Sequence, residues 1–388
     1  MDLEKNIHDK KVIRLQVNAA QVNYTTTAKF YDQIDGLRCF CVLGVLLQHF
    51  VSHDITKYLY TANIGVDLFF LISGFLITEI LINLKLKNTV GQALKIFYSR
   101  RILRIFPLYY LYWAILLLFF YNQVKGTVGW GLLYAYNFYN INNTEIPMAG
   151  HLWSLAVEEQ FYMVWPLVLL LVPYKNLKMC LIGLLSASLI FLLFYFNPKT
   201  YQFTYYHTFA CSVSLLSGAL LAYLKKEHTQ KLLNFLPKLS WTPLLGLIGS
   251  LAICYLVSKQ TIGQGYLIFM RLFVCVAGFY VVGRMALKPF KGFAGKVFVN
   301  KAALFIGRIS YGIYIYHLMV FLLLAPFINK AFEVIFNSSI FDNKILKYVK
   351  YNDTLFKFPV YTLIVIIVAA ISYYLFEKRF LKLKKYFE

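Results

Sequence analysis

Ten apolar runs of roughly membrane-spanning length divide this chain of 388 residues. A helix needs about 20 apolar residues to cross the hydrocarbon core of a bilayer. The chain is 60% hydrophobic and only 14% charged, which is too apolar for a soluble domain of this length. We therefore predict an all-α, polytopic membrane protein of about ten transmembrane helices. The predicted spans are 37–52, 62–82, 105–121, 152–172, 179–196, 205–224, 241–258, 264–283, 303–324 and 358–377.

Lysine and arginine residues are concentrated in alternate segments between these runs. Basic loops are retained in the cytoplasm during membrane insertion, so this pattern predicts that both termini are cytoplasmic. We therefore interpret the net charge of +22 as a signal that orients the protein in the membrane, and we expect no nucleic-acid partner. We divide the chain into a cytoplasmic lead-in at 1–34, a transmembrane domain at 35–380 and a basic cytoplasmic tail at 381–388.

Three polar residues share one predicted helix face at the first run: Asp35 just before it, and Arg38 and His49 within it. At 100° per residue, the eleven residues from Arg38 to His49 bring the two side chains within about 20° of each other. The helical rise separates them by about 16 Å, roughly half the thickness of a bilayer core. The pattern predicts a polar stripe that runs from a membrane surface to the membrane interior. Asp35 and Arg38 also have the spacing of a local ion pair, which would hold the guanidinium in place.

His49 and His53 are four residues apart, a spacing that puts two metal ligands on one helix face. No glutamate lies between them and no third ligand is evident, so we predict no metal site. The six cysteines all lie in apolar runs, and we interpret them as buried thiols rather than disulfides.

Several ionisable residues fall inside the predicted spans, where a charge needs a partner or an aqueous cavity. On the fourth run, Ser154, Glu158 and Tyr162 recur every four residues and form a polar face in the predicted outer half of the membrane. For His317, a bond to a neighbouring helix and a functional role are both open interpretations. The ionisable residues are His49, Asp67, Glu79, Glu158, Glu159, His207, Arg271 and His317.

Arg101 and Arg104 lie three residues apart at the predicted cytoplasmic end of the third span. They are interpreted either as topology anchors or as a binding site for a multiply charged phosphate, since each guanidinium binds two oxygens at once. Spacing alone does not decide between these two roles.

Five blocks of the sequence together resemble acyltransferase family 3, the integral membrane O-acyltransferases that acetylate or succinylate envelope glycans. They occur in order at 35–49, 64–77, 97–110, 151–162 and 309–317, and 374–378 is a weaker sixth block. The resemblance covers nearly the whole of 35–380. Cys39 stands where the family often has glycine, and Arg379 stands where it often has proline.

The resemblance implies that His49 is the catalytic histidine, that Arg38 is its essential companion, and that Arg101 and Arg104 bind near coenzyme A. We add Arg38 as a further candidate for contact with coenzyme A, either at a phosphate or at the thioester. The candidate acceptor-binding residues are Ser154, Glu158, Tyr162, Asp67 and His317.

The leading hypothesis is transfer of a short acyl group, with acetyl expected, from cytoplasmic acyl-CoA to a hydroxyl of a surface or lipid-linked carbohydrate. His49 would act as general base, and a covalent acyl-histidine step remains open. Acyl-CoA is the donor substrate, and no permanently bound cofactor is expected. The protein is expected in the cytoplasmic membrane of a bacterium. The alternative is a transporter for an acyl group, glycan or lipid, which intramembrane charges also suit.

Overall fold

The computed structural model describes residues 31–51, 56, 58–336 and 353–387. Most of the predicted lead-in, His53 and 337–352 of the predicted outer loop lie outside these residues. The helices described below belong to the compact unit Asp32–Glu388.

Ten long helices correspond to the ten predicted spans, and the described residues contain no strand. The long helices are α2 (Asp32–Phe50), α4 (Thr61–Lys87), α5 (Val90–Phe119), α9 (Leu152–Leu171), α10 (Leu177–Phe194), α12 (Thr208–Glu227), α14 (Thr242–Ser258), α15 (Ile268–Leu287), α18 (Ser310–Phe336) and α20 (Asp353–Ser372). The shorter α-helices are α6 (Tyr121–Val124), α7 (Val128–Leu132), α8 (Tyr136–Asn142), α11 (Gln202–Tyr206), α13 (Thr229–Phe235), α16 (Gly292–Val299), α17 (Lys301–Arg308) and α21 (Lys378–Lys382). The remaining turns of helix are η1 (Lys125–Thr127), η2 (Tyr174–Asn176), η3 (Leu236–Leu239), η4 (Gln264–Leu267), η6 (Tyr373–Glu377) and η7 (Leu383–Phe387).

Within the described residues, eight helices are long and apolar enough to cross a membrane, and a bent pair formed by α13–η3 and α14 makes a ninth candidate. This confirms the prediction of an all-α polytopic membrane protein. α2 does not meet the same criteria, because Asp35, Arg38 and His49 interrupt its apolar sequence. The count of ten spans and the cytoplasmic placement of both ends stay predictions.

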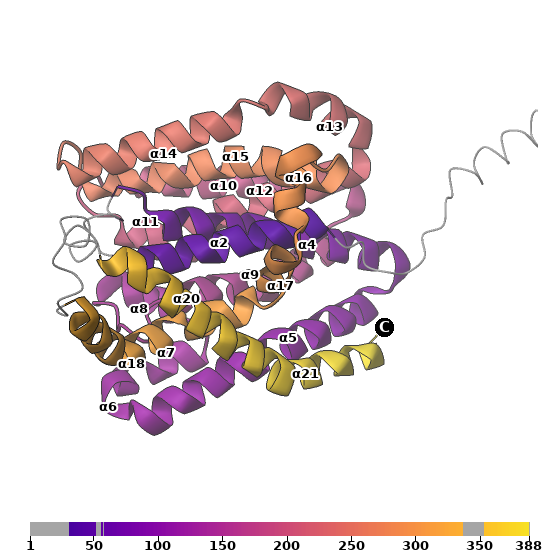
Figure 1. The fold of residues 1–388 in the computed structure, drawn as a ribbon. Helices are drawn as coiled ribbons and strands as arrows, with labels where there is room; N and C mark the ends of the chain where they lie inside the picture. The colour runs from indigo at the N-terminus through magenta and orange to yellow at the C-terminus, as the bar shows by residue number, and fades with distance from the viewer. Residues whose placement is uncertain (1–30, 52–55, 57, 337–352, 388) are drawn as a thin grey trace, which may run out of the picture. The chain divides into compact units, whose positions relative to one another are not determined.

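Helix α4 lies at the centre of the packing and contacts α2, α5, α9, α12 and α15. In Figure 1, α2 and α4 run between α10, α12, α14 and α15 on one side and α5, α9, α18 and α20 on the other. Glycines allow the closest of these contacts. A Cβ at Gly74 would lie 1.8 Å from the carbonyl oxygen of Leu215, and one at Gly218 would lie 2.0 Å from that of Leu71. The α4–α12 crossing therefore depends on backbone contact that only glycine permits.

The start of α2 packs against the two short helices α16 and α17. A Cβ at Gly36 would lie 1.8 Å from the Phe298 carbonyl oxygen, and one at Gly307 would lie 1.9 Å from the Asp35 carbonyl oxygen. The predicted span 303–324 is wrong at its start, since the chain breaks at Ile309 and α18 begins at Ser310. Close packing on α2 turns α17 away from the line of α18.

The segment between α5 and α9 folds into α6, η1, α7 and α8. Within this segment, α7 packs directly against α5. Tyr109 donates a hydrogen bond to the Gly131 carbonyl oxygen at 2.7 Å, and Tyr112 donates to that of Met148 at 2.6 Å. These bonds tie the segment to α5, and α8 packs on α9, where part of the candidate site lies.

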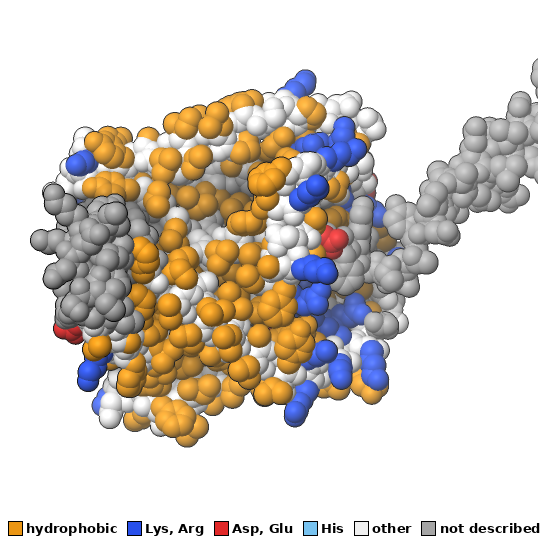
Figure 2. All heavy atoms as spheres, viewed as in Figure 1, with side chains coloured by type: hydrophobic (Ala, Val, Ile, Leu, Met, Phe, Trp, Pro, Cys, Tyr) orange, Lys and Arg blue, Asp and Glu red, His pale blue; other side chains and the backbone are white. Residues whose placement is uncertain are grey.

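Figure 2 shows apolar side chains over the middle of one face and a gathering of lysine and arginine at the end where α21 and the C-terminus lie. An apolar band with basic residues at one end is the distribution that membrane proteins use to set their orientation.

Candidate functional site

Three histidines from three helices meet inside the helix bundle. The imidazole centroids of His49 on α2 and His317 on α18 are 5.1 Å apart, and those of His317 and His151, at the start of α9, are 4.9 Å apart. His317 is fully buried and His151 is 5% exposed, whereas His49 is partly exposed. His49 is therefore the most exposed of the three histidines, and the fully buried His317 is its neighbour.

Hydrogen bonds hold the start of α9 against α18 beside the histidines. The Nε2 of His151 lies 3.0 Å from the Ile315 carbonyl oxygen. The Tyr314 hydroxyl donates to the His151 carbonyl oxygen at 3.1 Å and lies 2.6 Å from Ser154 Oγ. Ser154 thus belongs to the wall of this site, and its hydroxyl is engaged by a tyrosine.

A second group of polar side chains surrounds Glu158, one helical turn further along α9. The Ser73 hydroxyl of α4 donates to the Glu158 carboxylate at 2.7 Å. Arg38 and Arg101 both lie within electrostatic reach of this carboxylate. The Arg101 guanidinium lies 5.7 Å from the centroid of the Tyr162 ring. Helices α2, α4, α5 and α9 therefore converge on one carboxylate and two guanidinium groups.

The basic side chains extend from this group to the C-terminal helices. Arg104 lies within electrostatic reach of Arg38 and of Glu377 in η6. Lys384 in η7 interacts with the charges of Arg101 and Arg104, and η7 packs on α5. Arg38 also pairs with Asp35 at 3.8 Å, as its spacing predicted. The basic side chains thus gather beside two carboxylates, Asp35 on α2 and Glu377 on η6.

The histidine and arginine groups are connected along one face of α9. Ser154 and Glu158 are one turn apart, and Tyr314, which contacts Ser154, also lies within electrostatic reach of Glu158. The predicted polar stripe from Arg38 to His49 on α2 borders the same region. Together these residues form a line of polar side chains from the arginines to His49.

The position of Arg101 differs from the predicted arrangement. Ser154, Glu158 and Tyr162 were predicted in an outer half of the membrane and Arg101 at the inner mouth, but the Arg101 guanidinium lies over the Tyr162 ring. Lys85 donates to the Leu169 carbonyl oxygen at the other end of α9, the end predicted to be cytoplasmic. Tyr162 lies seven residues, or about 10 Å of helix, inside that end.

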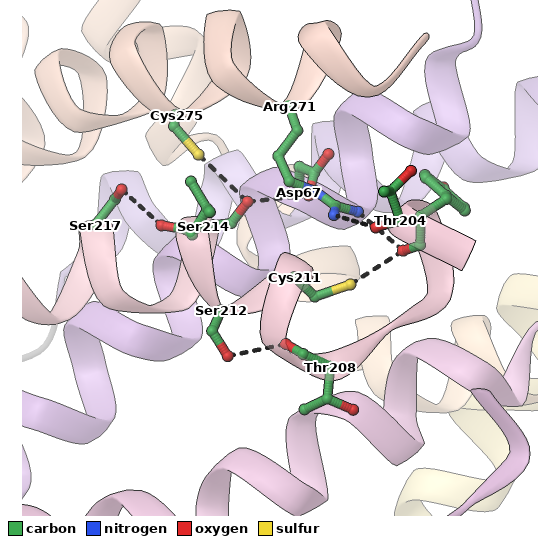
Figure 3. Close-up of polar contacts among 11 residues, drawn as sticks. Asp67, Thr204, Thr208, Cys211, Ser212, Ser214, Ser217, Arg271 and Cys275 are labelled. Atoms are coloured by element: carbon green, nitrogen blue, oxygen red, sulfur yellow. Dashed lines mark hydrogen bonds and ion pairs between the residues drawn. The ribbon is translucent and has the colours of Figure 1, made fainter. Parts of the chain in front are cut away.

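Asp67, a candidate acceptor-binding residue, lies in a buried ion pair (Figure 3). Arg271 Nε donates to its Oδ1 at 2.8 Å, and the Ser214 hydroxyl donates to the same oxygen at 3.0 Å. Arg271 also donates to the Thr204 and Tyr205 carbonyl oxygens at 3.3 and 3.1 Å. Asp67 joins α4 to α12 and α15, whereas the histidines lie on α2, α9 and α18.

His151 is the site residue that the sequence analysis missed. It lies one residue before the predicted span at 152–172, so it was not counted among the intramembrane ionisable residues. It precedes Ser154 by three residues and Glu158 by seven, which is the spacing of one helix face. Extending that face by one turn would have found it.

Among the described residues, no group of three or more histidine, cysteine, aspartate or glutamate side chains is arranged to hold a metal ion. The prediction of no metal involved His53, which lies outside the described residues.

The fold and the site define a multi-pass integral membrane protein with an ionisable, partly exposed centre inside its helix bundle. A family model described as an acyltransferase domain matches residues 31–376. The chain belongs to this acyltransferase family, as the five sequence blocks predicted.

Two curated relatives align over most of the chain. The peptidoglycan O-acetyltransferase OatA of Listeria monocytogenes is 31% identical over 324 residues, which are 77% of this chain and 50% of that protein. The O-acetyltransferase OatA of Staphylococcus aureus strain NCTC 8325 is 27% identical over 332 residues, which are 74% of this chain and 50% of that protein. The chain therefore spans about half the length of the curated relatives it matches. No solved structure matches it.

Proposed function

We propose that the protein transfers an acetyl group from acyl-CoA to a carbohydrate hydroxyl of peptidoglycan, and that it does so in the cytoplasmic membrane of a bacterium. The observation that carries the proposal is the line of polar side chains from Arg101 through Glu158 to the partly exposed His49. Family membership and the names of the two relatives support acetyl transfer and a peptidoglycan acceptor.

The donor is proposed to bind at the basic group. Arg101, Arg104 and Lys384 lie close enough for their charges to repel one another, and a phosphate would relieve that repulsion. Each guanidinium can hold two phosphate oxygens of coenzyme A. The thin pantetheine arm would extend along the polar line, and Arg38 would contact either a phosphate or the thioester carbonyl.

His49 is proposed to be the general base. Its unprotonated nitrogen takes the proton of the acceptor hydroxyl, and the hydroxyl oxygen forms a bond to the carbonyl carbon of the thioester. The carbon–sulfur bond breaks, the thiolate leaves, and the proton held by His49 passes to that thiolate. The products are the acetyl ester and free coenzyme A, and His49 returns to its starting state.

The acceptor is proposed to lie along the polar face of α9. Glu158, Ser154 and Tyr162 offer carboxylate and hydroxyl groups that suit the hydroxyls of a sugar. Glu158 is held by Ser73 through one oxygen, Oε1. A carboxylate has about four lone-pair sites, so it can accept further hydrogen bonds from a carbohydrate.

The test uses purified protein in proteoliposomes, acetyl-CoA labelled in its acetyl group, and a peptidoglycan oligosaccharide. We expect labelled ester on the oligosaccharide, and we expect His49→Ala to reduce it at least about 100-fold while coenzyme A binding persists. His228→Ala, at the end of α12, is the matched control and should transfer normally. Movement of the oligosaccharide without ester formation would favour the transporter interpretation, and full activity of His49→Ala would exclude His49 as the base.

A further inference from the structure

Two buried imidazoles at the site each have one bonded nitrogen and one nitrogen without a partner. His151 Nε2 lies 3.0 Å from the Ile315 carbonyl oxygen, and His317 Nδ1 lies 2.6 Å from that of Tyr314. A carbonyl oxygen only accepts, so these two nitrogens carry the hydrogens. In a neutral imidazole the other nitrogen is then a lone-pair acceptor. Within the described residues, both acceptors, His151 Nδ1 and His317 Nε2, are buried and have no donor.

His317 lies between the other two histidines. Its ring centroid is 5.1 Å from that of His49 and 4.9 Å from that of His151, and its side chain is fully buried. An unpaired buried acceptor costs free energy. A histidine kept with its Nε2 unpaired beside the partly exposed His49 therefore indicates a function other than stability.

Two tyrosine hydroxyls on the same helix as His317 are already engaged. The Tyr314 hydroxyl is shared between the His151 carbonyl oxygen and Ser154, and the Tyr316 hydroxyl lies 3.1 Å from Ser372 Oγ. A neutral His49 carries one N–H, and its imidazole ring lies next to that of His317. Hydrogen bonds at catalytic sites are often long in the absence of substrate and shorten in the complex.

We propose that His317 is a positioning residue whose Nε2 accepts the N–H of His49 when substrate is bound, and that it fixes the tautomer in which the other His49 nitrogen faces the acceptor hydroxyl. This inference rests on the proposed role of His49 as general base. His317 itself neither gains nor loses a proton in the step. When His49 takes the hydroxyl proton, its second N–H stays directed at the His317 lone pair, which stabilises the imidazolium.

The arrangement is that of a catalytic triad in which a neutral imidazole replaces the orienting carboxylate. The His151 bond to Ile315 and the Tyr314 bond to His151 hold the turn of α18 that carries His317. Because His317 Nδ1 is bonded within that same turn, its Nε2 has little freedom to rotate. Rigid support of this kind is what an orienting residue requires.

The test compares three substitutions of His317 in the proteoliposome assay. His317→Phe keeps the ring volume and removes the acceptor, and we expect kcat to fall about 100-fold or more with KM changed less than about threefold. His317→Gln places an amide oxygen near the Nε2 position, and we expect it to recover at least about tenfold over the phenylalanine variant. His317→Asn keeps a donor for the Tyr314 carbonyl oxygen, but its amide oxygen does not reach the Nε2 position. It should lose as much kcat as we expect for the phenylalanine variant, and it replaces that variant in the test if phenylalanine impairs folding.

The control is His207→Asn, which replaces the histidine that caps α12 with a good capping residue and should leave kcat unchanged. Failure of the wild type to transfer acetyl groups would overturn the proposed function. Full activity of His49→Ala would overturn the proposed role of His49 as general base. With both of those intact, two results would overturn the inference about His317. One is a phenylalanine or asparagine variant within about threefold of wild type, and the other is a well-folded glutamine variant as inactive as phenylalanine.

Discussion

Replacement of Arg271 by methionine tests whether Asp67 is a structural residue or an acceptor ligand. The Arg271 guanidinium is 1% exposed and the Asp67 carboxylate 5% exposed, at an N–O distance of 2.8 Å. Methionine fills similar volume without charge, so Arg271→Met leaves a buried carboxylate whose remaining donor is the Ser214 hydroxyl at 3.0 Å. It also removes the donors to the Thr204 and Tyr205 carbonyl oxygens.

The expected loss of stability follows from the burial of the pair. Breaking a buried ion pair by removing one partner costs about 3 to 5 kcal/mol, since the other charge remains uncompensated. At about 1.4 kcal/mol per factor of ten, the folded-to-unfolded ratio falls roughly 100- to 4,000-fold. Replacing both partners with apolar residues is often close to neutral. Asp67→Leu combined with Arg271→Met should therefore recover at least about 2 kcal/mol relative to the arginine substitution alone.

The free energy of unfolding is measured by reversible unfolding in mixed micelles. In parallel, acetyl transfer is measured and divided by the fraction of protein that is folded. Arg284→Met, on the same helix but only partly buried, is the control and should change stability by less than about 1 kcal/mol. We expect folded Arg271→Met and the double variant to retain transfer. Wild-type stability in Asp67→Asn, together with loss of acceptor use, would refute the structural role and restore Asp67 as a ligand.

The remaining predictions concern the two substrates. Lysine at both Arg101 and Arg104 keeps the charge but loses bidentate phosphate binding, so coenzyme A affinity measured by calorimetry should fall at least about tenfold; an unchanged affinity would make these arginines topology anchors. Glu158→Gln should raise the KM for the oligosaccharide while coenzyme A affinity changes little. If Glu158→Gln weakens the binding of coenzyme A and of the oligosaccharide equally, the role of Glu158 is instead to hold Arg38 and Arg101 in place.

The local parts of the structure could be predicted from the sequence. Apolar runs of bilayer length specify helices because unpaired backbone groups are too costly in lipid. The stripe from Arg38 to His49 follows from the period of a single helix, and α2 is continuous over both residues. The close approach at Gly74 was likewise predictable, since a glycine beside a serine in an apolar run favours helix contact.

The pairings between distant helices could not be predicted in the same way. His49 and His317, or Asp67 and Arg271, are more than 200 residues apart, and no local period relates them. Their contacts depend on which helix faces meet, and that is set by side-chain packing over the whole bundle. The break at Ile309 has the same origin, because α17 turns away where Gly307 meets the backbone of α2.

The satisfaction of hydrogen bonds separates two kinds of buried polar group in this protein. The Asp67–Arg271 pair is surrounded by serine and backbone partners, and such a pair can persist without a ligand. At the histidines the opposite holds, since among the described residues His151 Nδ1 and His317 Nε2 each lack a donor. An unpaired buried acceptor costs about 1 to 3 kcal/mol, so a donor supplied to either nitrogen would stabilise the cluster. A donor supplied to such an atom on binding or reaction would remove that cost. The unsatisfied histidine cluster is therefore the better candidate for chemistry, and the satisfied ion pair is the better candidate for structure.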